Sequence, residues 1–241
     1  MHMRPAPSIK EPALEDIARN LATVRARIAA AAARAGRDPA TVRLLAVSKH
    51  QPLPALEAAL TAGQQDFGEN YVQEALPKIA ALGPTAEWHL IGALQSNKSR
   101  EVAERFHWMH TVDREGIARR LSEQRPDTLP PLQVCLQVNI SDESSKGGVM
   151  PERVAELADA VAGLPRLKLR GLMAIPAPAT GFEAQRLPFR QLRELLDELK
   201  RRGHGLDTLS MGMSEDLEAA ITEGATLVRV GTAIFGKRPP K

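Results

Sequence analysis

Cysteine and long apolar segments are both scarce in this sequence. It contains a single cysteine, Cys135, and no apolar run close to bilayer-spanning length. A lone cysteine excludes an intrachain disulfide framework and a zinc site made of several cysteines, and it fits a reducing compartment. A spanning helix needs roughly 20 apolar residues, and the first residues lack the apolar core of a signal peptide. We therefore expect a cytoplasmic protein with no membrane partner.

Aromatic residues and charge of one sign are scarce as well. Phe, Trp and Tyr make up 3% of the chain, and 32 basic residues against 29 acidic ones leave a net charge of +3. Neither base stacking on aromatic side chains nor a concentrated basic surface is indicated, so no nucleic-acid partner is expected. The 43% apolar and 25% charged residues are typical of a folded globular domain.

Short apolar runs alternate with amphipathic segments along the chain. From Ser8 to Gly36, apolar residues recur every three or four positions, which predicts a long helix. Strands that alternate with helices form a parallel sheet, and the following eight runs favour a closed (β/α)8 TIM barrel over an open doubly wound sheet. We expect one domain over residues 1–241, with the N-terminal helix covering the gap after the last strand. The apolar runs are 42–48, 65–68, 88–92, 108–112, 132–140, 167–175, 208–211 and 227–235.

Lys49 ends the first apolar run and shares a strand face with Leu45 and Val47. Active groups of such barrels lie at the C-terminal ends of the strands. At the mouth of an apolar barrel, partial desolvation favours the neutral amine that imine formation with an aldehyde requires. The alternative is an ordinary lysine that faces water.

The segments after the seventh and eighth runs have features of an anion site. Ser214 precedes two acidic residues and an amphipathic stretch, which predicts a helix N-cap with open backbone amides. Gly231 lets a ligand approach the backbone, and Thr232 adds a hydroxyl. These loops commonly hold phosphate in (β/α)8 barrels, so we expect a phosphate site here, although simple capping also explains Ser214.

Arg229 interrupts an apolar strand and is expected to be buried. A buried guanidinium needs an acceptor. The acceptor is either a carboxylate inside the barrel, with Glu69 as a candidate, or a ligand atom such as a phosphate oxygen or a ring nitrogen. The histidines lack the spacing of metal ligands, so no metal site is expected, and His89 is interpreted as a packed, hydrogen-bonded residue.

Six segments between Val42 and Gly236 form a distinctive set. They are AVSK (46–49), FGENYVQE (67–74), WHLIGALQSNK (88–98), GLMA (171–174), LSMGMS (209–214) and VRVGTAIFG (228–236). Together they closely resemble the YggS/PROSC family of pyridoxal phosphate homeostasis proteins. The resemblance implies a single barrel similar to the N-terminal domain of alanine racemase, and binding of pyridoxal 5′-phosphate (PLP) without a settled catalytic activity.

The resemblance also implies roles for individual residues. Lys49 would form the Schiff base with the PLP aldehyde, and Arg229 would hydrogen-bond the pyridine nitrogen. Ser214 and the amides of Gly231 and Thr232 would hold the phosphate.

Two more residues, Asn70 and Met173, lie in motifs near the cofactor. Because arginine stays protonated, the ring nitrogen it contacts stays neutral and is a poorer electron sink. We also expect no acid/base pair for racemisation, since the lone tyrosine, Tyr71, lies in a helix-forming motif. We therefore expect a monomeric PLP carrier or buffer that supplies apo-enzymes. A PLP-dependent racemase of weak or narrow activity and a lysine aldolase acting on a phosphorylated sugar are the alternatives.

Overall fold

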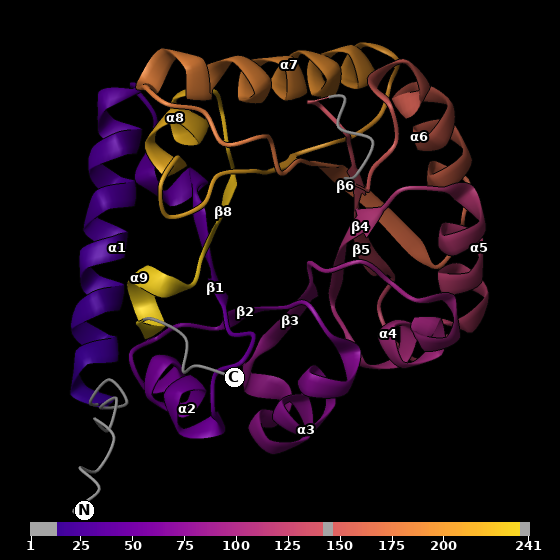
Figure 1. Ribbon diagram of the computed structural model, residues 1–241. Coiled ribbons are helices and arrows are strands. Elements are labelled where there is room, and N and C mark those ends of the chain that lie inside the picture. Colours follow the sequence, from indigo (N-terminus) through magenta and orange to yellow (C-terminus); the bar gives the residue numbers. More distant parts are fainter. Residues whose placement is uncertain (1–13, 142–146, 237–241) are drawn as a thin grey trace, which may run out of the picture.

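The computed structural model describes residues 14–141 and 147–236. Eight parallel strands close into one barrel in chain order, and helices surround it (Figure 1). The predicted closed (β/α)8 barrel is confirmed, and the open sheet is wrong. The prediction of one domain over 1–241 includes residues outside the described ranges and stays a prediction. The strands are β1 (Arg43–Val47), β2 (Asp66–Glu69), β3 (Glu87–Leu90), β4 (Trp108–Val112), β5 (Leu132–Gln137), β6 (Leu167–Met173), β7 (Thr208–Ser210) and β8 (Leu227–Val230).

The helices between the strands pack one apolar stripe against the barrel. In α5, Ile117, Ala118 and Leu121 are buried, and this three-to-four spacing is what an amphipathic helix needs to cover a sheet. The same pattern recurs around the ring. These helices are α2 (Leu53–Thr61), α3 (Val72–Leu82), α4 (Ser99–Arg105), α5 (Glu115–Gln124), α6 (Val154–Ala162), α7 (Phe182–Arg201) and α8 (Leu217–Thr222).

Helix α1 (Leu14–Arg34) lies outside the ring, against α2, α8 and the short α9 (Thr232–Phe235) (Figure 1). Its buried face carries Ile17, Leu21 and Ile28, all at most 4% exposed. Asn20 Nδ2 donates to the Ile234 carbonyl at 2.9 Å, which ties α1 to the segment after the last strand. The predicted start at Ser8 lies outside the described residues.

The predicted strand over 227–235 is wrong in its second half. Strand β8 ends at Val230, and α9 follows after Gly231, whose carbonyl accepts the amides of both Ile234 and Phe235. Ile234 and Phe235 are buried, as a strand would also require. A buried strand and a buried helix both give a continuous apolar run. The sequence therefore did not distinguish a strand from a helix in this segment.

The barrel interior has apolar and polar sections. Leu45 and Val47 pack with Ile91 and Leu227, as the alternation along β1 predicts. A second cluster contains Trp108, Met173 and the lone cysteine. Burial raises the pKa of that cysteine, Cys135, to about 12, so its thiol is unreactive at neutral pH.

Candidate functional site

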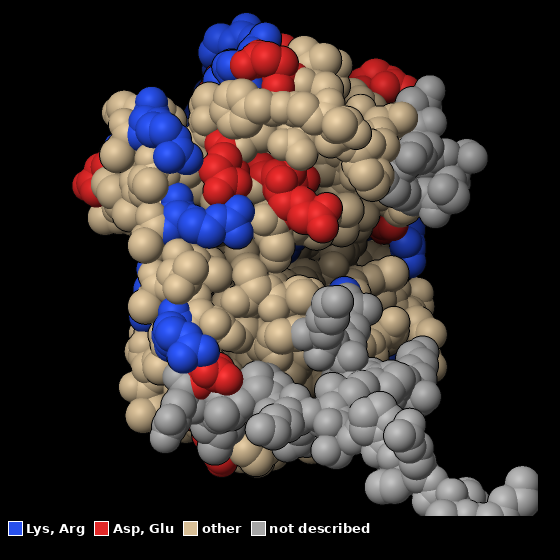
Figure 2. Space-filling model, turned by 60° about the vertical axis from the view of Figure 1, so that its left-hand side comes forward, with Lys and Arg blue, Asp and Glu red and all other residues tan. Residues whose placement is uncertain are grey.

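A cavity of about 300 Å³ lies at the C-terminal ends of the strands. Five predicted site residues line it: Lys49, Ser214, Arg229, Gly231 and Thr232. The rest of the wall comes mainly from the segment after β6, the start of α7 and the segment after β7. In Figure 2, which shows the α1 side of the molecule, acidic side chains lie beside a hollow in a largely uncharged surface.

The backbone on both sides of the candidate lysine is held by β2 and α3. Ser48, fully buried, donates from its amide to β2 and from Oγ to Glu69 Oε1 at 2.6 Å, and its carbonyl accepts Lys78 Nζ at 2.9 Å. His50 adopts a left-handed φ of 62°, and its amide donates to Glu74. Because both neighbours are fixed, the half-buried lysine leaves the barrel rim in a defined direction.

Arg229 is buried, as predicted, at 4% exposed. Its Nη1 donates to the Ser210 carbonyl at 2.6 Å and to Ser210 Oγ at 2.8 Å, and Nη2 donates to the Ala174 carbonyl at 2.9 Å. The suggested partner Glu69 is wrong, because alternation along β2 turns its carboxylate outward to Lys78 in α3, 2.8 Å away. Three described hydrogen bonds account for three of the five guanidinium N–H donors of Arg229, which also lines the cavity.

The Arg229 guanidinium stays positively charged although it is buried. Desolvation lowers the pKa of Arg229 to about 10, while the nearby Asp216 carboxyl acts in the opposite direction. A pKa of about 10 still leaves the group protonated at neutral pH. The cavity therefore contains a permanent cationic hydrogen-bond donor.

Ser214 is not a helix N-cap, contrary to the prediction. Helix α8 begins at Leu217, and Asp216 occupies the capping position. The Asp216 carboxylate accepts the Met213 amide at 2.6 Å, which turns the chain before the helix. Ser214 thus lies in the loop, half-buried, and its carbonyl accepts Arg27 Nη2 at 3.1 Å.

Backbone donors line one wall of the cavity. The amides of Ser214, Gly231 and Thr232 donate no hydrogen bond to any described residue. At Gly231 a Cβ would lie 3.2 Å from the Val47 carbonyl oxygen and 3.3 Å from its Cβ, so glycine lets the chain pass close to β1. Unpaired amides grouped on one wall suit an anion, because they can replace its hydration shell.

Two predicted residues do not line the cavity of Lys49. Asn70 lines a separate cavity of about 250 Å³ together with Ile91 and Gly92. Met173 is fully buried inside the barrel. Both cavities lie at the C-terminal ends of the strands, and the predicted roles of Asn70 and Met173 stay predictions.

Sequence reasoning missed a polar group deeper in the barrel. Asp66, Glu87 and His89 place three potential metal ligands within 4.8 Å of one another. Arg43 pairs with both carboxylates of this group, so the protein itself offsets part of its negative charge. The spacing of these three residues in the sequence did not indicate a metal site, because they come from two different strands. His89 is hydrogen-bonded and fully buried, as interpreted from the sequence.

The comparisons with known proteins agree with this architecture. Residues 18–239 match the family model described as alanine racemase, N-terminal domain, which defines the class of barrel. The pyridoxal phosphate homeostasis protein of Pseudomonas aeruginosa is 61% identical over 226 residues, covering 93% of this chain and 97% of the relative. The chain belongs to the family of pyridoxal phosphate homeostasis proteins, as its motifs predicted.

Two further matches extend this result. The pyridoxal phosphate homeostasis protein of Escherichia coli K12 is 58% identical over 229 residues, covering 93% of this chain and 98% of the relative. The structure of PipY from Synechococcus elongatus PCC7942 with PLP bound matches with a TM-score of 0.78 and 39% identity, covering 91% of this chain and 100% of PipY. No described helix has the length and apolar character that membrane crossing demands.

Proposed function

We propose that this chain binds PLP in the cavity at the barrel mouth and acts in PLP homeostasis. The observation that carries the proposal is the convergence in one cavity of an amine (Lys49), a buried cationic donor (Arg229) and the unpaired amides after β7 and β8. PLP carries an aldehyde, a ring nitrogen and a phosphate, and each of these groups finds a chemically matched partner. PipY, the relative solved with PLP bound, supports the assignment.

Lys49 supplies the amine for a reversible Schiff base with the aldehyde, the chemistry on which storage of this reactive cofactor depends. The clamped backbone on either side of Lys49 directs the side chain into the cavity. The amides of Ser214, Gly231 and Thr232 bind the phosphate, which they can do without giving up bonds to other described residues.

Arg229 binds the pyridine nitrogen with a remaining N–H donor. Because its pKa of about 10 keeps the guanidinium protonated, the ring nitrogen acts as an acceptor and stays neutral. A neutral ring stabilises carbanions poorly. Tyr71 is 55% exposed at the start of α3 and does not line the cavity, so it is unavailable as the racemisation acid.

These features favour a carrier or buffer over an enzyme. The chain holds PLP through a reversible covalent bond and passes it to PLP-requiring apo-enzymes, acting as a monomer in the cytoplasm. Light scattering of the PLP-loaded protein measures its oligomeric state, and a stable dimer would contradict the monomer.

Borohydride reduction followed by peptide mass mapping tests the proposal. Reduction should fix PLP on the peptide that contains Lys49, and the Lys49→Ala variant should lose both the label and the visible absorbance. Lys98→Ala, which removes a half-buried lysine at the start of α4, is the matched control and should keep both. Labelling of another lysine in the wild type would refute the assignment.

Enzyme and carrier differ in an isotope-exchange assay. A carrier should show no multiple-turnover exchange of the α-proton of any amino acid in deuterated water. Exchange that is abolished in Lys49→Ala would replace the carrier function with that of a racemase or related enzyme.

A further inference from the structure

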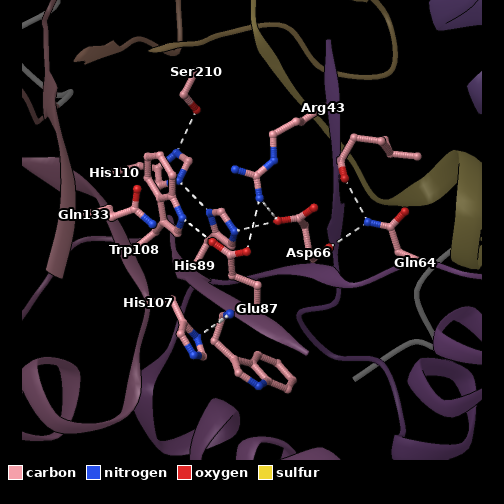
Figure 3. Close-up of polar contacts among 12 residues, drawn as sticks. Arg43, Gln64, Asp66, Glu87, His89, His107, Trp108, His110, Gln133 and Ser210 are labelled. Atoms are coloured by element: carbon pink, nitrogen blue, oxygen red, sulfur yellow. Dashed lines mark hydrogen bonds and ion pairs between the residues drawn. The ribbon is translucent and has the colours of Figure 1, made fainter. Parts of the chain in front are cut away.

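A chain of hydrogen bonds crosses the barrel interior from Arg229 to Asp66, and Figure 3 shows its course from Ser210 onward. Arg229 Nη1 lies 2.8 Å from Ser210 Oγ, and Ser210 Oγ lies 2.8 Å from His110 Nδ1. His110 Nε2 then lies 2.9 Å from His89 Nδ1, and His89 Nε2 lies 3.1 Å from Asp66 Oδ1. The chain thus joins β8, β7, β4, β3 and β2.

With both histidines neutral, as their burial favours, the carboxylate end fixes the direction of every hydrogen bond in this chain. The Asp66 carboxylate can only accept, so His89 donates to it from Nε2 and accepts through Nδ1 from His110 Nε2. His110 then accepts through Nδ1, so Ser210 Oγ donates its proton to His110, while the same oxygen accepts from Arg229, which can only donate. Both rings are therefore protonated on Nε2.

The charges around the chain are consistent with this protonation. Burial lowers the pKa of both His89 and His110, that of His110 well below its ordinary value. Burial alone would raise the pKa of Asp66, but the hydrogen bond from His89 and the charge of Arg43 outweigh it, so Asp66 stays ionised.

The Asp66 end is anchored by further contacts. Arg43 pairs with Asp66 and, at 3.4 Å, with Glu87 (Figure 3). Trp108 Nε1 donates to Glu87 at 2.5 Å, while its ring stacks on His89 with an angle of 10° between the planes. The His89 ring is thus fixed by stacking on Trp108 and by hydrogen bonds at both of its nitrogens. The hydrogen-bond chain therefore has little freedom to rearrange.

We infer that Ser210, His110 and His89 are positioning residues for Arg229, which hold one edge of its guanidinium at the back of the cavity and leave its other N–H groups for the ligand ring. Donation directed away from Arg229 toward an ionised carboxylate stabilises the buried positive charge and keeps the group a donor. This inference rests on the proposed function, because the ring nitrogen of PLP is the acceptor that Arg229 would serve.

Nitrogen-15 NMR of the histidine rings in the PLP-free protein tests the hydrogen-bond chain directly. At neutral pH, His89 and His110 should each give the signals of a neutral ring protonated on Nε2. Either ring protonated on Nδ1, or on both nitrogens, would overturn the inference. The measurement needs no bound cofactor, so its outcome is separate from the success or failure of the proposed function.

PLP binding by variants tests the positioning role. Ser210→Ala removes one oxygen from the chain and should raise the dissociation constant for PLP about tenfold, the effect expected from losing a hydrogen bond to a charged group. His110→Gln should act in the same direction. Ser210→Thr keeps the hydroxyl and should restore binding toward the wild-type level.

A purely structural role predicts a different pattern. Loss of packing would lower the thermal midpoint without changing the absorption maximum of bound PLP, whereas a displaced Arg229 should shift that maximum. The control is His107→Gln, which alters a histidine that does not belong to the hydrogen-bond chain. It should leave the absorption maximum of bound PLP unchanged. Wild-type affinity and an unshifted maximum in both Ser210→Ala and His110→Gln would refute the positioning role.

Discussion

The position of a functional side chain in this protein depends on contacts with residues from other strands and helices. Arg229 is an out-of-place charge in the sequence, yet its role follows from Ser210 on β7 and from the carbonyl that follows β6. Lys49 depends in the same way on Glu74 and Lys78 of α3, which hold the backbone beside it. Two predictions belong to this scale.

The buried histidines should make the protein sensitive to mild acid. Because the pKa values of His89 and His110 are lowered in the folded chain, the unfolded chain binds more protons below the ordinary value of 6.5. The free energy of unfolding should therefore fall as the pH drops below this value, by at most about 1.4 kcal/mol per pH unit for each histidine. Urea denaturation across this pH range measures the slope.

Variants isolate the histidine contribution. His110→Gln should reduce the slope by one histidine's share. Glu69 acts in the opposite sense, because burial raises its pKa, and comparison with the wild type removes its effect. Equal slopes in the wild type and His110→Gln would contradict the prediction.

Gly231→Ala tests the close approach of Gly231 to β1 beside the proposed phosphate site. The backbone φ of −118° accepts alanine, so any effect comes from the new methyl group, placed 3.2 Å from the Val47 carbonyl. We expect a loss of about 1 kcal/mol in stability and weaker PLP binding, because β1 or the amide wall must shift. Denaturation and fluorescence titration measure both.

The matched control for this substitution is Gly116→Ala. Gly116 lies in α5 with nothing within 4 Å of its added Cβ. Alanine should stabilise that helix by about 0.5–1 kcal/mol. Unchanged PLP affinity in Gly231→Ala would show that the amides tolerate the added methyl group.

At the scale of elements, each of the eight apolar runs in the sequence overlaps one strand of the barrel. Hydrophobic periodicity also predicted the helix that becomes α1. It failed where burial removes the pattern, as in residues 227–235, and where a loop residue looks like a cap, as at Ser214. The backbone path of residues 227–235 depends on the neighbouring strands, and that of the loop at Ser214 depends on the Asp216 side chain. The intrinsic conformational preferences of the residues describe neither contact.

Helix α1 contributes stability to the barrel through its apolar face. Leu21 is fully buried in the main core, so Leu21→Ala should lower the free energy of unfolding by about 2–5 kcal/mol. Ala22→Ser, on the exposed face of the same helix, should change it by less than about 0.5 kcal/mol. Urea denaturation compares the two, and equal effects would show that α1 does not pack as described.

For the whole molecule, closure of the barrel brings together residues far apart in the chain. Lys49 and Thr232 line one cavity because β1 pairs directly with β8. The same closure places the Arg43 and Asp66 end of the hydrogen-bond chain inside the ring that also carries Arg229. Ligand binding should therefore stabilise the fold as a unit.

PLP should raise the unfolding free energy by mass action. At a free concentration 100 times its dissociation constant, the expected gain is about 2.7 kcal/mol. Lys49→Ala should show a much smaller gain at the same PLP concentration, because the covalent contribution is lost. Thermal unfolding with and without PLP measures the difference, and equal gains in the two proteins would contradict covalent holding by Lys49.

The sequence by itself determined the eight-stranded alternation, the burial of Arg229 and, through its motifs, the family. These features are local or nearly so, because they depend on periodicity and on short contiguous segments. Only the tertiary structure decided which groups meet: Ser210 rather than Glu69 beside Arg229, and two histidines in line between a guanidinium and a carboxylate. Such contacts depend on the register of strands that closure brings together, and no single segment of the chain encodes that register.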